Sequence, residues 1–247
     1  AMVATPIALA KTVDGLSIAA GLQIHETIAR GLRAIWPGAW RSGVGVLMSF
    51  GLIQFSGLAY AQTGASAEVA SYLLALRIIQ AISVFSQPPF YSKLPVMARL
   101  RSQGMVERQI ELARKGMMLS HWTYLLGFLA VGVASEGVLR LIGSQADFVS
   151  YAMWSLLGLA FFFERLGAMH IQLYSTTNKI IWHVANGSTG LVIIVLCYFL
   201  HARLGLMTFP VSMCVAYATV YCVISLWHSY RAFGLRIMDF EWSVRLK

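Results

Sequence analysis

The stretch that decides the fold is GVGVLMSFGLIQFSGLAYAQ at residues 43–62, which contains no charged side chain. A helix crosses the hydrocarbon core of a bilayer with about 20 mostly apolar residues. This stretch therefore predicts a transmembrane helix, and further apolar stretches follow it at short intervals. Together they predict an all-α polytopic membrane protein, folded as one bundle of six transmembrane helices. The predicted spans are 43–62, 68–90, 117–142, 148–174, 180–200 and 206–230.

The composition agrees with a membrane protein. Of the 247 residues, 58% are hydrophobic and 12% are charged, whereas an average soluble domain has about 25% charged residues. This composition excludes an intrinsically disordered chain and argues against a soluble domain. Six spans of about 20 residues fit the length of the chain, and twelve do not. The cysteines lie in apolar runs without a C-x-x-C pair, and they predict neither a disulfide framework nor a redox site.

The two ends of the chain differ from its central region. Residues 22–36 place Arg30 and Arg33 among apolar residues at helical spacing, which predicts an amphipathic helix at the membrane surface. The breaks between the spans are short and polar, apart from one long basic break at 91–116. The predicted domains are an N-terminal segment at 1–40, a transmembrane lobe at 41–230 and a basic cytoplasmic tail at 231–247.

The net charge of +9 is informative through its distribution. Basic residues accumulate on the cytoplasmic side of membrane proteins. If the first span runs outward, only Arg140 and Arg203 fall near the outer side. This predicts that both ends of the 43–230 region are cytoplasmic, and that the charge attracts anionic lipid rather than nucleic acid. The basic residues on the predicted cytoplasmic side are Arg30, Arg33, Arg41, Lys93, Arg99, Arg101, Arg108, Arg114, Lys115, Lys179, Arg231, Arg236, Arg245 and Lys247.

Arg77 stands near the middle of the second predicted span, where an ionisable side chain is costly and is a functional candidate. Gln80, Ser83 and Gln87 follow at helical spacing and predict a polar stripe on one face. One interpretation is the wall of a hydrated cavity, with a cation suited to a phosphate or another anion. The other is an ion pair with Glu164 that locks two helices together, and the two interpretations are compatible.

Glu164 and Arg165 are neighbours in the fourth predicted span. Adjacent residues of a helix point about 100° apart, and we expect neither side chain to face lipid. Glu164 is a candidate for a proton or sodium site, or for the partner of Arg77. Gln172 follows two turns after Arg165 and is expected to extend the polar face of that residue.

Small residues recur along the first predicted span: Ser42, Ser49, Ser56 and Thr63 are seven residues apart. Small residues at such spacing let helices pack closely in lipid. The alternative is a second cavity wall, to which Gln54 would contribute from a different face.

No catalytic constellation is present in the sequence. It contains no P-loop, no G-x-S-x-G and no H-E-x-x-H motif, and no two histidines have the spacing of metal ligands on a helix. The sequence therefore predicts no catalytic residue, no metal site and no cofactor.

Four short motifs occur in an order typical of a known family. WPGAWRSG at 36–43 leads into the first span, and ASYLLALRI at 70–78 lies within the second. KLPVMARL at 93–100 opens the basic break, and LIG at 141–143 closes the next span. Over about residues 30–230, the chain resembles the second half of a bacterial polysaccharide/O-antigen flippase of the MOP superfamily, which includes the MATE exporters.

The resemblance implies two six-helix lobes around a central cavity. Such transporters move lipid-linked oligosaccharides across the inner membrane by alternating access, usually with ion coupling. It implies that Arg77 is the best candidate for contact with the pyrophosphate. From the polar stripes themselves we add Gln80, Gln87 and Arg165 as further candidate substrate contacts, and Glu164 as a candidate for ion coupling or for an ion pair. Membrane lipid and the lipid-linked oligosaccharide are then the expected partners. Because only one lobe is present, we also expect a missing or separate N-terminal lobe, or a lobe that dimerises.

Two other functions compete with transport. An integral-membrane enzyme of envelope glycan assembly would need acid or base residues at an interface, for which Glu136 and Asp147 are the candidates. A non-transporting membrane scaffold would use Arg77 and Glu164 for structure alone. We favour the transporter, which is not an enzyme, in the bacterial inner membrane.

Overall fold

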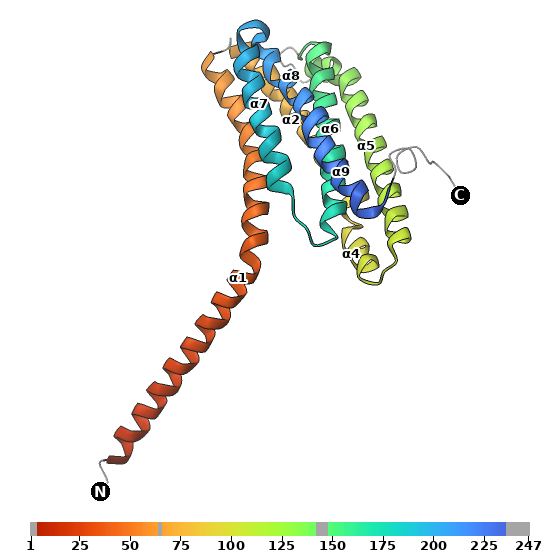
Figure 1. Ribbon diagram of the computed structural model, residues 1–247. Helices are drawn as coiled ribbons and strands as arrows, with labels where there is room; N and C mark the ends of the chain where they lie inside the picture. Colours follow the sequence, from red (N-terminus) through yellow and green to blue (C-terminus); the bar gives the residue numbers. More distant parts are fainter. Residues whose placement is uncertain (1–3, 64–65, 142–147, 236–247) are drawn as a thin grey trace.

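The computed structural model describes residues 4–63, 66–141 and 148–235, with side-chain environments from residue 31 onward. Within these ranges every regular element is a helix, which confirms the predicted all-α polytopic class (Figure 1). A short 3₁₀ turn (Gly205–Met207) and a π-helical turn (Tyr217–Tyr221) interrupt the last part of the chain. The α-helices are α1 (Ala4–Thr63), α2 (Ser66–Phe85), α3 (Pro88–Tyr91), α4 (Leu94–Ser102), α5 (Val106–Leu141), α6 (Tyr151–Ser175), α7 (Trp182–Leu204), α8 (Thr208–Ala216) and α9 (Cys222–Phe233).

The number of spans differs from the prediction. Five helical stretches of the described chain are long and apolar enough to cross a membrane, not six. The predicted fifth and sixth spans fall in one apolar stretch, Trp182–Phe233, of 52 residues. A straight helix of that length would measure about 80 Å at 1.5 Å per residue. Instead the chain turns back at Gly205, whose φ of 52° lies in the region that favours glycine, so α8 packs beside α7.

Two further predictions about the ends of the spans are corrected. Residues 22–36 do not form a separate helix, because α1 is one continuous helix whose N-terminal half projects away from the bundle (Figure 1). The predicted break at 91–116 is largely helical, since it contains α4 and the start of α5. The short break predicted between the third and fourth spans, at 143–147, lies outside the described residues. So do the end of the basic tail and the side chains of residues 22–30.

Helix α6 forms the centre of the bundle, in contact with α2, α5, α8 and α9. Gly158 and Gly167 allow this packing, since a Cβ atom at Gly158 would lie 2.2 Å from the Phe128 ring and one at Gly167 would lie 2.5 Å from the Tyr221 ring. Outward-facing positions are apolar as well, as expected in lipid; Val133, for example, is 86% exposed. The end of α9 and the projecting part of α1 lie at the same end of the bundle as α4 (Figure 1).

Candidate functional site

A cavity of about 480 Å³ lies among α1, α6, α7 and the segment that joins α2 to α3. Its wall is rich in hydroxyl, amide and carboxyl groups, although the helices that form it are apolar overall. We call it the polar cavity. It is lined by Ser42, Val46, Ser49, Phe50, Gln87, Tyr91, Glu164, Ala168, Gln172, Ser175, Ile180, Trp182 and Asn186.

Helix α6 contributes Glu164, Ala168, Gln172 and Ser175 to the polar cavity. These positions are three or four residues apart and therefore share one face of the helix. Gln172 thus extends the face of Glu164, not that of Arg165 as the spacing had suggested. The cavity face of α6 consequently carries a carboxyl group at membrane depth, with an amide two turns away.

Arg165 is only 2% exposed and points away from this cavity face. Its guanidinium donates to the carbonyl oxygen of Ser83 at 2.6 Å and to that of Ser86, and lies 5.9 Å from the centre of the Tyr124 ring. Ser83 lies in the last turn of α2 and Ser86 directly follows the helix, at the end where the helix dipole places partial negative charge. Arg165 is therefore a cap of α2 in this conformation, which argues against its predicted role as a substrate contact.

The end of α2 is also where the second predicted span breaks. Pro88 and Pro89 begin α3 and cannot donate backbone hydrogen bonds, so the helix cannot continue unchanged through them. Non-helical backbone at membrane depth is tolerated where it is buried in protein or lines a cavity. Here the break brings Gln87 and Tyr91 to the polar cavity, which Glu164 also lines.

Arg77 lies elsewhere, on an exposed face formed by α1 and α2. Its guanidinium donates to the Oε1 atom of Gln54 at 2.9 Å and to the Oε1 atom of Gln80 at 3.3 Å. The predicted ion pair of Arg77 with Glu164 is absent from the described part of the chain. Arg77, Gln54 and Gln80 thus form a second polar group, here called the Arg77 cluster.

The predicted substrate contacts are therefore divided between two places. Arg77 and Gln80 lie together in the Arg77 cluster, whereas Gln87 lies in the polar cavity with Glu164. The common stripe is lost because α2 ends at Phe85, before Gln87. Sequence reasoning also missed Tyr91 and Asn186 of the polar cavity, although the Pro88-Pro89 pair was a signal for the break that places Tyr91 there.

The small residues of α1 serve both of the roles that were considered for them. Ser42 and Ser49 line the polar cavity, whereas the Ser56 hydroxyl is buried and donates to the Ile53 carbonyl oxygen at 2.7 Å. Close packing is evident at Gly45, whose carbonyl oxygen accepts a hydrogen bond from Asn186 Nδ2 at 3.0 Å. Gln54 lies on a different face, as expected, and bonds to Arg77.

No group of described residues has the composition of a metal site. Glu136 and Asp147, the candidates for an interfacial enzyme, have side chains outside the described set, so the enzyme alternative stays a prediction. Comparisons with protein-family models, with curated proteins and with solved structures found no match to this chain.

Proposed function

We propose that this chain is one lobe of a membrane transporter that translocates a lipid-linked oligosaccharide across the bacterial inner membrane by alternating access. The observation that carries the proposal is the Arg77 cluster, a cation at mid-span on an exposed face of the bundle. The polar cavity beside the broken second span is the supporting observation.

An exposed arginine at mid-span is energetically unfavourable in contact with lipid. Translocon-based scales assign about 2.5–3.5 kcal/mol to an arginine at the centre of a membrane helix. Hydrogen bonds to Gln54 and Gln80 orient the guanidinium but leave its positive charge without a counterion in the described chain. An anionic ligand supplies that counterion, and a planar guanidinium fork matches the oxygen atoms of a phosphate group.

The exposed face around the Arg77 cluster has the character of an interface. Large apolar side chains of α1 and α2 are exposed on the outside of the bundle, among them Phe50 at 64% and Phe85 at 80% exposed. We propose that a second lobe packs here, either a separate N-terminal lobe or a second copy of the chain. The Arg77 cluster would then face a central cavity instead of lipid.

The polar cavity has a separate role in this proposal. Its hydroxyl and amide groups suit sugar hydroxyl groups, and Glu164 is the proposed binding site for the coupling proton or sodium ion. Arg165 would keep the break of the second span in place beside this cavity and would not touch the substrate. Both ends of the 43–230 region would be cytoplasmic, as the distribution of basic residues predicts.

The test is translocation of an undecaprenyl-pyrophosphate-linked saccharide in proteoliposomes, with the chain alone and with a supplied first lobe. We expect flipping only when both lobes are present, and an at least tenfold lower rate in Arg77→Ala. Arg99→Ala, at an exposed position of α4, is the matched control and should flip at the original rate. A folded Arg77→Ala variant that flips at the original rate would refute the proposal.

A further inference from the structure

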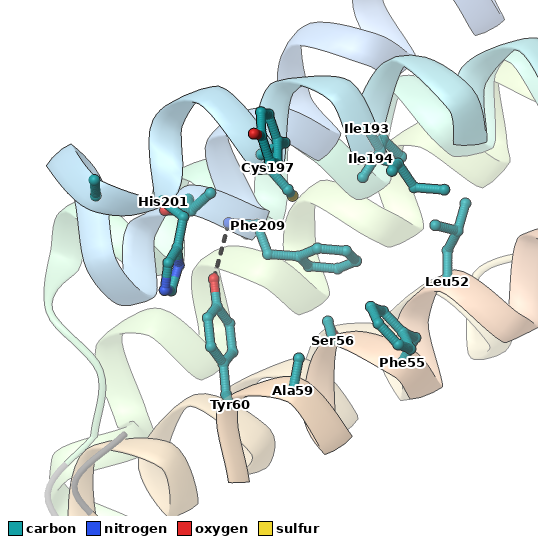
Figure 2. A pocket seen from close by; sticks show the side chains of 13 residues that line it. Leu52, Phe55, Ser56, Ala59, Tyr60, Ile193, Ile194, Cys197, His201 and Phe209 are labelled. Atoms are coloured by element: carbon teal, nitrogen blue, oxygen red, sulfur yellow. Dashed lines mark hydrogen bonds between the residues drawn. The ribbon is translucent and has the colours of Figure 1, made fainter. Parts of the chain in front are cut away.

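A second cavity, of about 500 Å³, lies between α1 and α7 and is closed at one end by the start of α8 (Figure 2). We call it the apolar pocket. Its floor is formed by buried side chains, including Tyr60, Ile193 and Phe209. Its rim is exposed and includes Phe55 at 64% and Tyr198 at 81% exposed. The pocket therefore opens on the outer surface of the bundle.

The polar groups of the floor are already hydrogen-bonded to the protein. The Tyr60 hydroxyl donates to the Leu206 carbonyl oxygen at 3.1 Å and accepts from the Phe209 backbone N–H at 2.9 Å (Figure 2). The Ser56 hydroxyl donates to the Ile53 carbonyl oxygen. The hydroxyl groups of Tyr60 and Ser56 are therefore not available to a ligand. The rest of the pocket wall is largely hydrocarbon, so the pocket is apolar.

Thr208 is the exception. Its side chain is 2% exposed and lines the pocket, and its Oγ1 atom has no hydrogen-bond partner among the described residues. A buried hydroxyl without a partner is unfavourable, because nothing compensates for its loss of hydrogen bonds to water. His201, at the rim, brings a second polar group to this end of the pocket.

The medium around the helices and the volume of the apolar pocket indicate which kind of ligand occupies it. The helices that form it are long and apolar enough to span a membrane, so we expect lipid at its mouth, and water is disfavoured in apolar cavities. Its volume equals that of roughly 17 water-sized groups at about 30 Å³ each, which is the scale of one lipid chain. The Thr208 hydroxyl is buried in this conformation, and a rotation of its side chain toward the pocket would let an ester carbonyl at the head of such a chain accept its unused hydrogen bond.

We propose that the apolar pocket is a binding site for one acyl chain of a glycerophospholipid, with the ester group of that chain at Thr208 and His201. The chain lies between α1 and α7, and its head group lies near the turn at Gly205–Met207. This site does not depend on the proposed transport function, because neither Arg77 nor the polar cavity takes part in it.

The test is native mass spectrometry of the full chain, reconstituted in phosphatidylethanolamine and phosphatidylglycerol and extracted into a mild detergent. We expect one retained phospholipid per chain. Ala59→Trp and Ile194→Trp fill the pocket and should lower this retention at least fivefold. Ala61→Trp and Val195→Trp are the matched controls, because they add the same ring at exposed positions outside the lining and should retain the lipid.

A further variant tests the position of the ester group, and other outcomes would overturn the proposed lipid site. Thr208→Val keeps the shape of the side chain and should weaken retention if the ester group binds there. Equal retention in the filled and control variants, or no retained lipid in the original chain, would overturn the proposal. A dimer lost only in the filled variants would assign the pocket to a second copy, and displacement of the phospholipid by added polyprenyl phosphate would assign it to an isoprenoid chain.

Discussion

Replacing Arg165 by alanine tests the assignment of this residue as a cap of α2. The substitution removes two charge-assisted hydrogen bonds, to the carbonyl oxygens of Ser83 and Ser86, and empties a site that is 2% exposed. Hydrogen bonds that involve a charged group contribute about 1.5–3 kcal/mol each, so two of them give about 3–6 kcal/mol, from which part of the desolvation cost of the buried guanidinium is subtracted. We expect Arg165→Ala to lower the free energy of unfolding by roughly 3–5 kcal/mol.

The assay is reversible unfolding in mixed detergent micelles, followed by circular dichroism. Arg165→Lys should recover only part of the loss, because one ammonium group cannot match the planar fork that reaches both carbonyl groups. Arg99→Ala, at an exposed position on α4, should change the free energy of unfolding by less than about 0.5 kcal/mol. A loss below about 1 kcal/mol in Arg165→Ala would refute the capping argument, since the two bonds alone exceed it.

Three further variants test other parts of the structure. Gly158→Ala should destabilise the chain by about 1–3 kcal/mol in the same unfolding assay, because the new Cβ would lie 2.2 Å from the Phe128 ring; an unchanged stability would contradict the α5–α6 packing. Tyr60→Phe should lower the free energy of unfolding by about 1 kcal/mol, because the hydrogen bonds to Leu206 and Phe209 are lost. An unchanged free energy of unfolding would show that these two hydrogen bonds contribute nothing to stability. Glu164→Gln should leave the free energy of unfolding nearly unchanged but should abolish the dependence of flipping on a proton or sodium gradient. If the variant still depends on the gradient, Glu164 is excluded as the coupling site.

The break in the second span connects several of these observations. Pro88 and Pro89 end the helical hydrogen bonding, Arg165 binds the carbonyl groups left at the end of α2, and Gln87 and Tyr91 then line the polar cavity. Stability and cavity shape are therefore coupled at this point. A loss of Arg165 should consequently affect the polar cavity as well, without Arg165 itself lining it.

The all-α membrane class followed from the sequence alone, for a physical reason. An uncharged run such as residues 43–62 must satisfy its backbone hydrogen bonds without water, and in lipid a helix does so within the segment. The same reasoning identified Arg77, Glu164 and Arg165 as side chains that need polar surroundings. It also identified the small residues of α1, although not which of them pack and which line a cavity.

Only the tertiary structure decided which of these side chains meet. Helical spacing places residues on a common face only while the helix continues, and α2 ends before Gln87, so Gln87 joins Glu164 while Arg77 bonds to Gln54 of α1. A partner on another helix depends on packing and on where the chain bends, which spacing within one helix does not contain. For the same reason the sequence could not show that Arg165 would cap α2. Arg165 is separated along the chain from Ser83 by 82 positions and from Ser86 by 79 positions, and only the tertiary packing brings them together.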